Sequence, residues 1–193
     1  MDAADIASTT GTVVIACGLA IAGLFAFGIA AAPRGVKRAL PPVAAFAAGV
    51  VFFALAADVA TQAHQRFGEW LTSEHGIDAP WRFEQVEDAI VMGYVAVGAL
   101  AMVALLPFLI RSPRFFGSLS FALALLAGAA ATNAFADVRY VTPIATQALA
   151  AAGAIELALA FSREASRDAH LLKLPHERLH GSAWRETYRA RRA

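Results

Sequence analysis

The sequence predicts an all-α, polytopic membrane protein with five transmembrane helices in a bundle, and three observations support this prediction. Hydrophobic residues make up 59% of the 193 residues, and the mean hydropathy is +0.57, whereas soluble domains are about half apolar. The apolar residues are gathered in runs of about 20, the length that crosses a bilayer core of about 30 Å as a helix. Charged residues make up 16% of the chain and lie mostly between these runs.

The chain divides into a transmembrane part, residues 1–162, and a basic cytoplasmic tail, residues 163–193. Because the connections between the runs are short, we expect consecutive helices to be antiparallel neighbours. The first run lacks the basic flank of a secretory signal and follows Asp2 and Asp5, so we interpret it as a spanning helix. The expected spans are residues 8–32, 41–63, 87–110, 115–136 and 141–162.

Small residues recur every fourth position in two of these runs. This spacing places them on one helix face, where they let a neighbouring helix approach closely. An alternative is that the high Ala and Gly content produces such a register by chance. The two stripes are Gly18, Ala22, Ala26 and Ala30, and Ser120, Ala124, Gly128, Thr132 and Ala136.

The distribution of Lys and Arg predicts the orientation in the membrane. Arg34, Lys37, Arg38, Arg111, Arg114 and all the basic residues after residue 162 would lie on one side, and Arg66, Arg82 and Arg139 on the other. By the positive-inside rule the first side is cytoplasmic. We therefore expect the N-terminus outside and the C-terminus inside a bacterial-type inner membrane, with an acidic outer face.

Candidate ion or metal ligands lie near the outer ends of the second and third spans. Asp58 sits inside the end of the second span, and a carboxylate within a span is a functional hypothesis. Glu87 and Asp88 from the next span would complete a cation or proton site with it. A regular helix would rotate His64 about 120° away from Asp58. The alternatives are a hydrated Asp58 and acids that only stabilise the start of the third span.

Two further features enter the metal hypothesis. Carboxylate and imidazole side chains suit several divalent ions, so His64 and His75 could join the acids, although their spacing matches no strong pattern. The segment His176–Glu177–Arg178–Leu179–His180 matches the H-E-x-x-H zinc motif. Its position in a polar tail, with few residues left to supply a third ligand, favours a surface helix.

Glu156 lies inside the fifth span and shares its every-fourth register with Ala148, Ala152 and Ala160. It should face packed helices and needs a partner. It is either part of a relay or a structural ion pair or protonated carboxyl. Its candidate partners are Lys37, Arg111, Arg114 and Asn133.

Two non-spanning segments have helical patterns. Phe67, Trp70 and Leu71 predict a short amphipathic helix on the membrane surface, with Trp70 at the interface. Residues 163–174 can continue the fifth helix out of the membrane, and Pro175 should break or kink it. The basic residues of the tail either bind anionic lipid headgroups or only set the topology.

These patterns leave three function classes open. The first is a non-enzymatic accessory, assembly or scaffold component that docks other membrane helices or a second copy. The second is a small proton, cation or metal transporter or channel that uses Asp58, Glu87, Asp88 and Glu156. The third is a membrane-embedded enzyme with a carboxylate-histidine site. The spans lack paired histidines for haem, the chain lacks a Gly-rich phosphate loop, and its basic tail has few aromatic residues, so no cofactor is indicated and nucleic acid is not expected.

Overall fold

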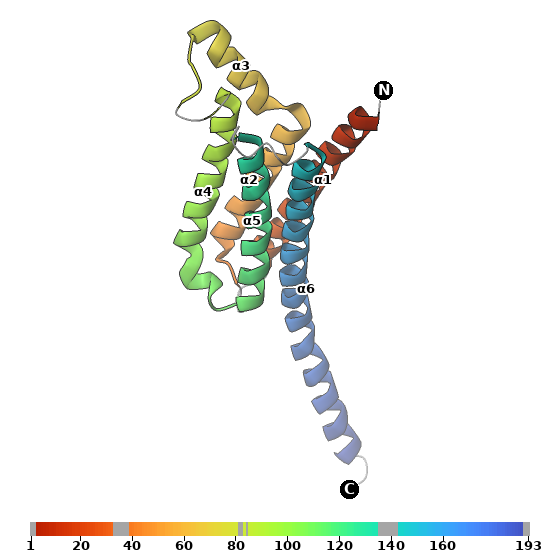
Figure 1. The fold of residues 1–193 in the computed structure, drawn as a ribbon. Coiled ribbons are helices and arrows are strands. Elements are labelled where there is room, and N and C mark those ends of the chain that lie inside the picture. Colours follow the sequence, from red (N-terminus) through yellow and green to blue (C-terminus); the bar gives the residue numbers. More distant parts are fainter. Residues whose placement is uncertain (1–2, 33–38, 81–82, 84, 135–142, 191–193) are drawn as a thin grey trace.

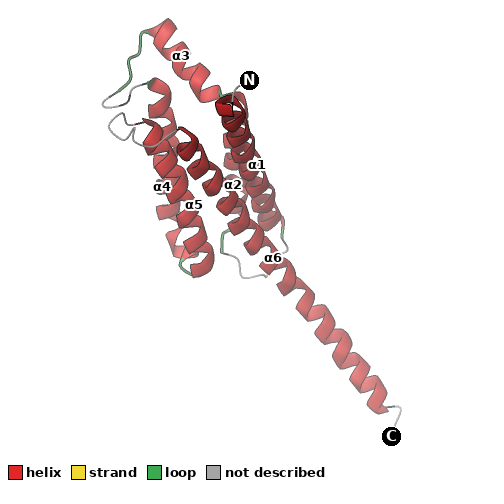
Figure 2. Cartoon of the chain, turned by 45° about the vertical axis from the view of Figure 1, so that its right-hand side comes forward, coloured by secondary structure: helices red, strands yellow, loops and turns green. Residues whose placement is uncertain are grey.

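The computed structural model contains six α-helices among the described residues (Figure 1). It describes residues 3–32, 39–80, 83, 85–134 and 143–190, with side chains for 9–32, 39–80, 83, 85–134 and 144–167. All the regular secondary structure in these ranges is helical (Figure 2). The helices are α1 (Ala3–Ala31), α2 (Pro42–Thr61), α3 (Ala63–His75), α4 (Val86–Leu109), α5 (Pro113–Ala134) and α6 (Pro143–Ala190).

Five of these helices are long and apolar enough to cross a membrane, which supports an integral membrane protein. Each overlaps one of the spans expected from the sequence. The boundaries are Thr9–Ala31, Pro42–Thr61, Val86–Leu109, Pro113–Ala134 and Ile144–Arg167.

The ends of the helices follow local backbone chemistry. Pro42 is the first residue of α2, where a missing N–H costs nothing because first-turn N–H groups have no intrahelical partner. Gln62 adopts a left-handed conformation with φ 53° and separates α2 from α3. Gly76, with φ 60°, ends α3, as glycine commonly does after a helix.

By their backbone contacts the five spanning helices form a curved row in the order α2, α1, α6, α5, α4, which folds back so that α2 lies behind α4 and α5 in the view of Figure 1. The α3 helix joins the outer ends of α2 and α4; we call this end outer, and the opposite end inner. In the described part of the chain, the backbone of α4 approaches only α5 and α3. Among the described residues the backbones of α2 and α4 do not approach each other, although side chains of both helices belong to the same hydrophobic core.

Glycines permit the close helix crossings of this row. A Cβ atom at Gly18 of α1 would lie 2.9 Å from the Cβ of Ala154 in α6, and one at Gly153 would lie 2.8 Å from Leu126 of α5. Ala22 and Ala26 are fully buried beside Gly18. The expected small-residue face of the first span is therefore confirmed at these positions.

The second expected stripe does not form such a crossing at Gly128. A Cβ atom there would meet no heavy atom within 4 Å, and Ala124 is exposed. Thr132 does reach α6, where its hydroxyl lies 3.2 Å from that of Thr146. Ala136 lies outside the described residues.

Aromatic rings fill the inner half of the core. Phe161 of α6, 1% exposed, is the largest fully buried side chain. Phe52 of α2 and Phe115 of α5 meet its ring edge-on, each with centroids 5.3 Å apart. Edge-to-face contacts of this kind add to the packing of the three helices.

The α6 helix is longer than its span and continues without interruption through Pro175 to Ala190 (Figure 1). The expected continuation of the fifth helix is present, and of the expected break or kink at Pro175 the break is absent. The neighbouring Leu, Lys, Glu and Arg residues favour helix, which offsets the backbone hydrogen bond that proline removes and the clash of its ring with the carbonyl four residues earlier. The H-E-x-x-H segment at 176–180 lies within this helix, and its side chains are outside the described set.

Candidate functional site

The corner between α2 and α3 brings Asp58 and His64 together. The Nδ1 atom of His64 lies 3.0 Å from Oδ2 of Asp58, and the His64 backbone N–H donates to Oδ1 at 2.8 Å. The expectation that His64 points away from Asp58 was wrong, because α2 stops at Thr61. The left-handed Gln62 then turns the chain back toward the carboxylate.

This pair gives Asp58 a structural role. His64 is the second residue of α3, so its N–H is one of the first-turn donors that lack an intrahelical partner. The Asp58 carboxylate accepts from this donor and lies near the positive end of α3. Both side chains are mostly buried, at 14% exposed for Asp58 and 17% for His64. The desolvation cost of the Asp58 carboxylate is therefore compensated by groups of the same chain.

Asp88 links the outer ends of α4 and α5. It is the third residue of α4 and only 5% exposed. Its carboxylate accepts hydrogen bonds from the Gln85 backbone and from the Asn133 side-chain amide at 3.1 Å. The contact with Gln85 corresponds to one of the two hydrogen bonds of a capping box, in which the side chain of the third helical residue accepts from the backbone N–H of the N-cap residue.

The α3 helix contacts the first turn of α4 at Glu87. A Cβ atom at Gly68 of α3 would lie 2.9 Å from the backbone N of Glu87 and 3.0 Å from its Cβ. The Glu87 carboxylate is within electrostatic range of Asp88, Glu69 and His64. His64 also acts on Asp88. Three acids proposed from the sequence, Asp58, Glu87 and Asp88, thus lie around His64.

The structure assigns no metal to this cluster. Among the residues described, no group of three or more His, Cys, Asp and Glu side chains is arranged to hold a metal ion. His75 lies against the ring of Trp70, with centroids 4.2 Å apart. Trp70 also stacks on Phe67 at 5.7 Å.

The expected amphipathic helix exists as α3, with Phe67 and Trp70 about half exposed. Trp70 is two residues beyond Gly68, which places it about 200° around the helix from the face that contacts α4. The Phe67–Trp70 pair is therefore turned away from the first turn of α4.

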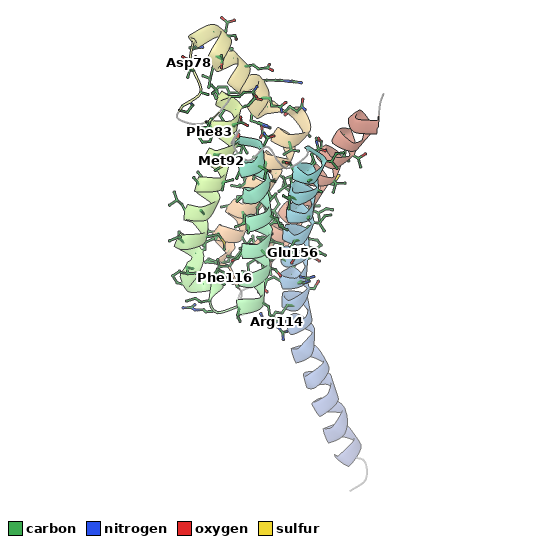
Figure 3. All side chains as sticks on the ribbon, viewed as in Figure 1. Asp78, Phe83, Met92, Arg114, Phe116 and Glu156 are labelled. Atoms are coloured by element: carbon green, nitrogen blue, oxygen red, sulfur yellow. The ribbon has the colours of Figure 1, made fainter. Side chains whose placement is uncertain are left out.

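Glu156 lies part-way along the spanning part of α6, far from α3 (Figure 3). Its Oε1 atom is 3.4 Å from Nη1 of Arg163, two turns along the same helix. Arg111, Arg114 and Asn133, which the sequence offered as partners, do not have this contact, and Lys37 lies outside the described residues. Arg163 lies two turns after Glu156 on the same face of α6, and its long side chain reaches back toward the helix N-terminus. The partners expected from the sequence all lie outside α6.

The expectation that Glu156 faces packed helices holds only in part. Ala160 is buried, but Ala148 and Ala152, which share its register, are exposed. The Glu156 side chain is 22% exposed and that of Arg163 is 63% exposed. Glu156 therefore lies at the edge of the packed face of α6, where its pairing with Arg163 reduces the free-energy cost of two charges within the membrane.

A second polar cluster, at the inner end, was missed because the sequence analysis assigned its main residues to the tail. Glu164 is 5% exposed, and its Oε1 accepts from the Ala39 N–H at 3.3 Å. Arg167 lies 3.8 Å from Glu164 Oε2. The available signal was the helical register, since Glu164 follows Leu157 and Phe161 by seven and three residues on one face.

Two hollows on the described spanning surface are apolar. One lies between α1 and α2, lined by residues such as Phe27, Val43 and Phe46. The other lies between α1 and α6, lined by residues such as Val14 and Ile155. No charged side chain lines either hollow, so neither resembles a polar substrate site. No protein-family model, curated protein or solved structure matches this chain.

Proposed function

We propose that the protein is a non-enzymatic component of a membrane assembly, in which α4 packs against a transmembrane helix of another polypeptide or of a second copy. The observation that carries this proposal is the exposure of α4. None of its most apolar window is buried, compared with 17–33% in the other four spanning helices. A helix that has so few contacts within its own chain has most of its surface free for another helix.

Two glycines of α4 fit the same proposal, although Gly28, Gly117 and Gly128 on other helices are equally open. Cβ atoms at Gly93 and Gly98 would meet nothing within 4 Å. By contrast, Gly18 and Gly153 lie at crossings with other helices of this chain, where a side chain would collide. Glycine lowers helix propensity by about 1 kcal/mol relative to alanine, and in membranes it is typical of close helix contacts.

A proton or cation transporter is the second candidate, favoured by the gathering of Asp58, Glu87 and Asp88 around His64. A transport path would also have to cross the spans. At Gly153, between Thr146 and Glu156, α6 packs closely on α5, because a Cβ atom there would meet the Leu126 side chain and the backbone of Ala122. In the described side chains the polar groups along this contact are thus interrupted, which favours the first proposal.

The proposal is tested by gentle purification of the full chain from native membranes, followed by native mass spectrometry. Gly93→Leu should release a stoichiometric partner or second copy that the wild type retains. Ala47→Leu, on the exposed face of α2, is the matched control and should retain it. A wild-type chain that is monomeric with no stoichiometric companion would contradict the proposal.

The transporter alternative is tested separately in proteoliposomes. Flux of protons or cations that exceeds that of empty vesicles and falls in Asp58→Asn would favour it over docking. Flux equal to that of empty vesicles would remove it.

A further inference from the structure

Four residues at the inner end connect three separate parts of the chain, and we call them the inner clamp. Glu164 accepts from the backbone N–H of Ala39, which precedes α2. Arg167 lies near Glu164 and donates from Nη1 to Oγ of Ser112 at 3.4 Å. Ser112 lies in the turn between α4 and α5. The clamp therefore joins α6 to both inner connections.

Each point of attachment is anchored in the packed interior. Ala39 is 3% exposed and Ser112 is 5% exposed. Their neighbours Leu40, Leu109 and Phe115 belong to the hydrophobic core. Because these attachment points are packed, a contact with them fixes the position of Glu164 and Arg167 relative to the spanning helices.

Glu164 is too buried to be an ordinary surface acid. Removing a carboxylate from water is costly unless charged or hydrogen-bonding groups compensate it. The Ala39 N–H and Arg167 provide such compensation. Arg167 is 57% exposed, so its guanidinium spans the boundary between the packed helices and their surroundings.

The clamp lies where α6 leaves the other helices. Beyond Arg167, residues 168–190 continue as helix away from the rest of the molecule (Figures 1 and 2). Between the clamp and Pro175 the helix has no proline to kink it. The direction in which the extension leaves the other helices is thus set by the contacts made just before it.

We propose that Glu164 and Arg167 are positioning residues that hold the α6 extension in a fixed direction relative to the α4–α5 turn. The Arg167–Ser112 contact transmits displacement between the turn and the extension. The Glu164–Ala39 contact prevents α6 from rotating about its axis when this happens. The proposal concerns the chain itself and does not depend on the docking role of α4.

The test measures spin-label distances in the full-length chain reconstituted in lipid nanodiscs, with Cys17→Ala as background. One label pair, at Arg114→Cys and Ser182→Cys, reports the extension against α5. A second pair, at Ser166→Cys and Ser182→Cys, lies within α6 and reports whether the helix itself is intact. Arg167→Ala and Glu164→Gln are compared with the wild type. Arg163→Ala is the matched control, because Arg163 is also exposed but contacts Glu156.

The wild type should give a narrow distribution for the first pair, and Arg167→Ala should broaden it about twofold because one tether is lost. Glu164→Gln should broaden it less, since the amide oxygen still accepts from Ala39. Arg163→Ala should leave it unchanged, and the second pair should be unchanged in every variant. A broad wild-type distribution, equal broadening in Arg163→Ala, or no broadening in Arg167→Ala would each overturn the proposal.

Discussion

His64 and Asp58 are joined through both the side chain and the backbone of the histidine, with distances of 3.0 Å and 2.8 Å to the two carboxylate oxygens. Both contacts depend on the left-handed Gln62 between the two helices. A non-glycine residue with positive φ is uncommon and carries some strain. The Asp58–His64 pair is thus the feature that stabilises this sharp corner.

Replacing Asp58 should loosen the corner. Asp58→Ala removes the acceptor for the His64 N–H and the side-chain contact, so we expect the free energy of unfolding to fall by about 1–3 kcal/mol. Asp58→Asn keeps an acceptor oxygen and should have less than half of this effect. Thermal unfolding in detergent measures both. Thr61→Ala, which removes only an exposed intrahelical bond to Ala57, is the control and should have little effect.

Adding a methyl group at Gly68 should separate α3 from α4. Gly68→Ala places a Cβ within 3.0 Å of Glu87 atoms, and the backbone there cannot yield without moving a helix. The gain of about 1 kcal/mol in helix propensity should be outweighed, and the melting temperature should fall by a few degrees. Gly128→Ala gains the same propensity where a Cβ atom would meet nothing within 4 Å and should be neutral or stabilising. Equal melting temperatures for the two variants would show that α3 does not rest on α4.

Asp88 and Asn133 should be energetically coupled. Among the described contacts, the side-chain amide of Asn133 in α5 donates a hydrogen bond to the buried Asp88 carboxylate of α4. A double-mutant cycle with Asp88→Ala and Asn133→Ala should give a coupling energy of about 1–2 kcal/mol. Additive effects of the two substitutions on the free energy of unfolding would show that the hydrogen bond does not form in the membrane.

Membrane orientation, inferred from the Lys and Arg count, is open to direct measurement. In a Cys17→Ala background, Ser73→Cys in α3 should react with a membrane-impermeant maleimide in intact spheroplasts. Ser182→Cys in the α6 extension should react only after the membrane is opened. The reverse pattern would invert the assignment of the outer and inner ends.

The sequence predicted the helices well because their signal is local. A run of about 20 apolar residues needs no tertiary information to be read as a span. The stripe at Gly18, Ala22 and Ala26 was also correct, since close helix crossings require small residues wherever they occur.

The contacts between polar groups were less predictable, because each depends on a turn or register that hydropathy does not encode. His64 was placed away from Asp58 since a continuous helix was assumed through Gln62, a residue with no composition signal for a left-handed turn. Glu164 was placed in the tail because the apolar run ends before it. Gly128 was placed in a packed stripe although spacing alone does not say which face of α5 meets a neighbour.

The length of α6 has a mechanical consequence. A helix of 48 residues measures about 70 Å, and crossing the hydrocarbon core takes only about 30 Å of it. The remainder projects beyond the membrane boundary, so a change in its tilt at that boundary moves its far end. A tilt of about 10° there would move the far tip by roughly 7 Å, because the remainder is about 40 Å long. Small changes in helix tilt within the membrane would therefore produce a displacement of the α6 tip that is about as large as a side chain.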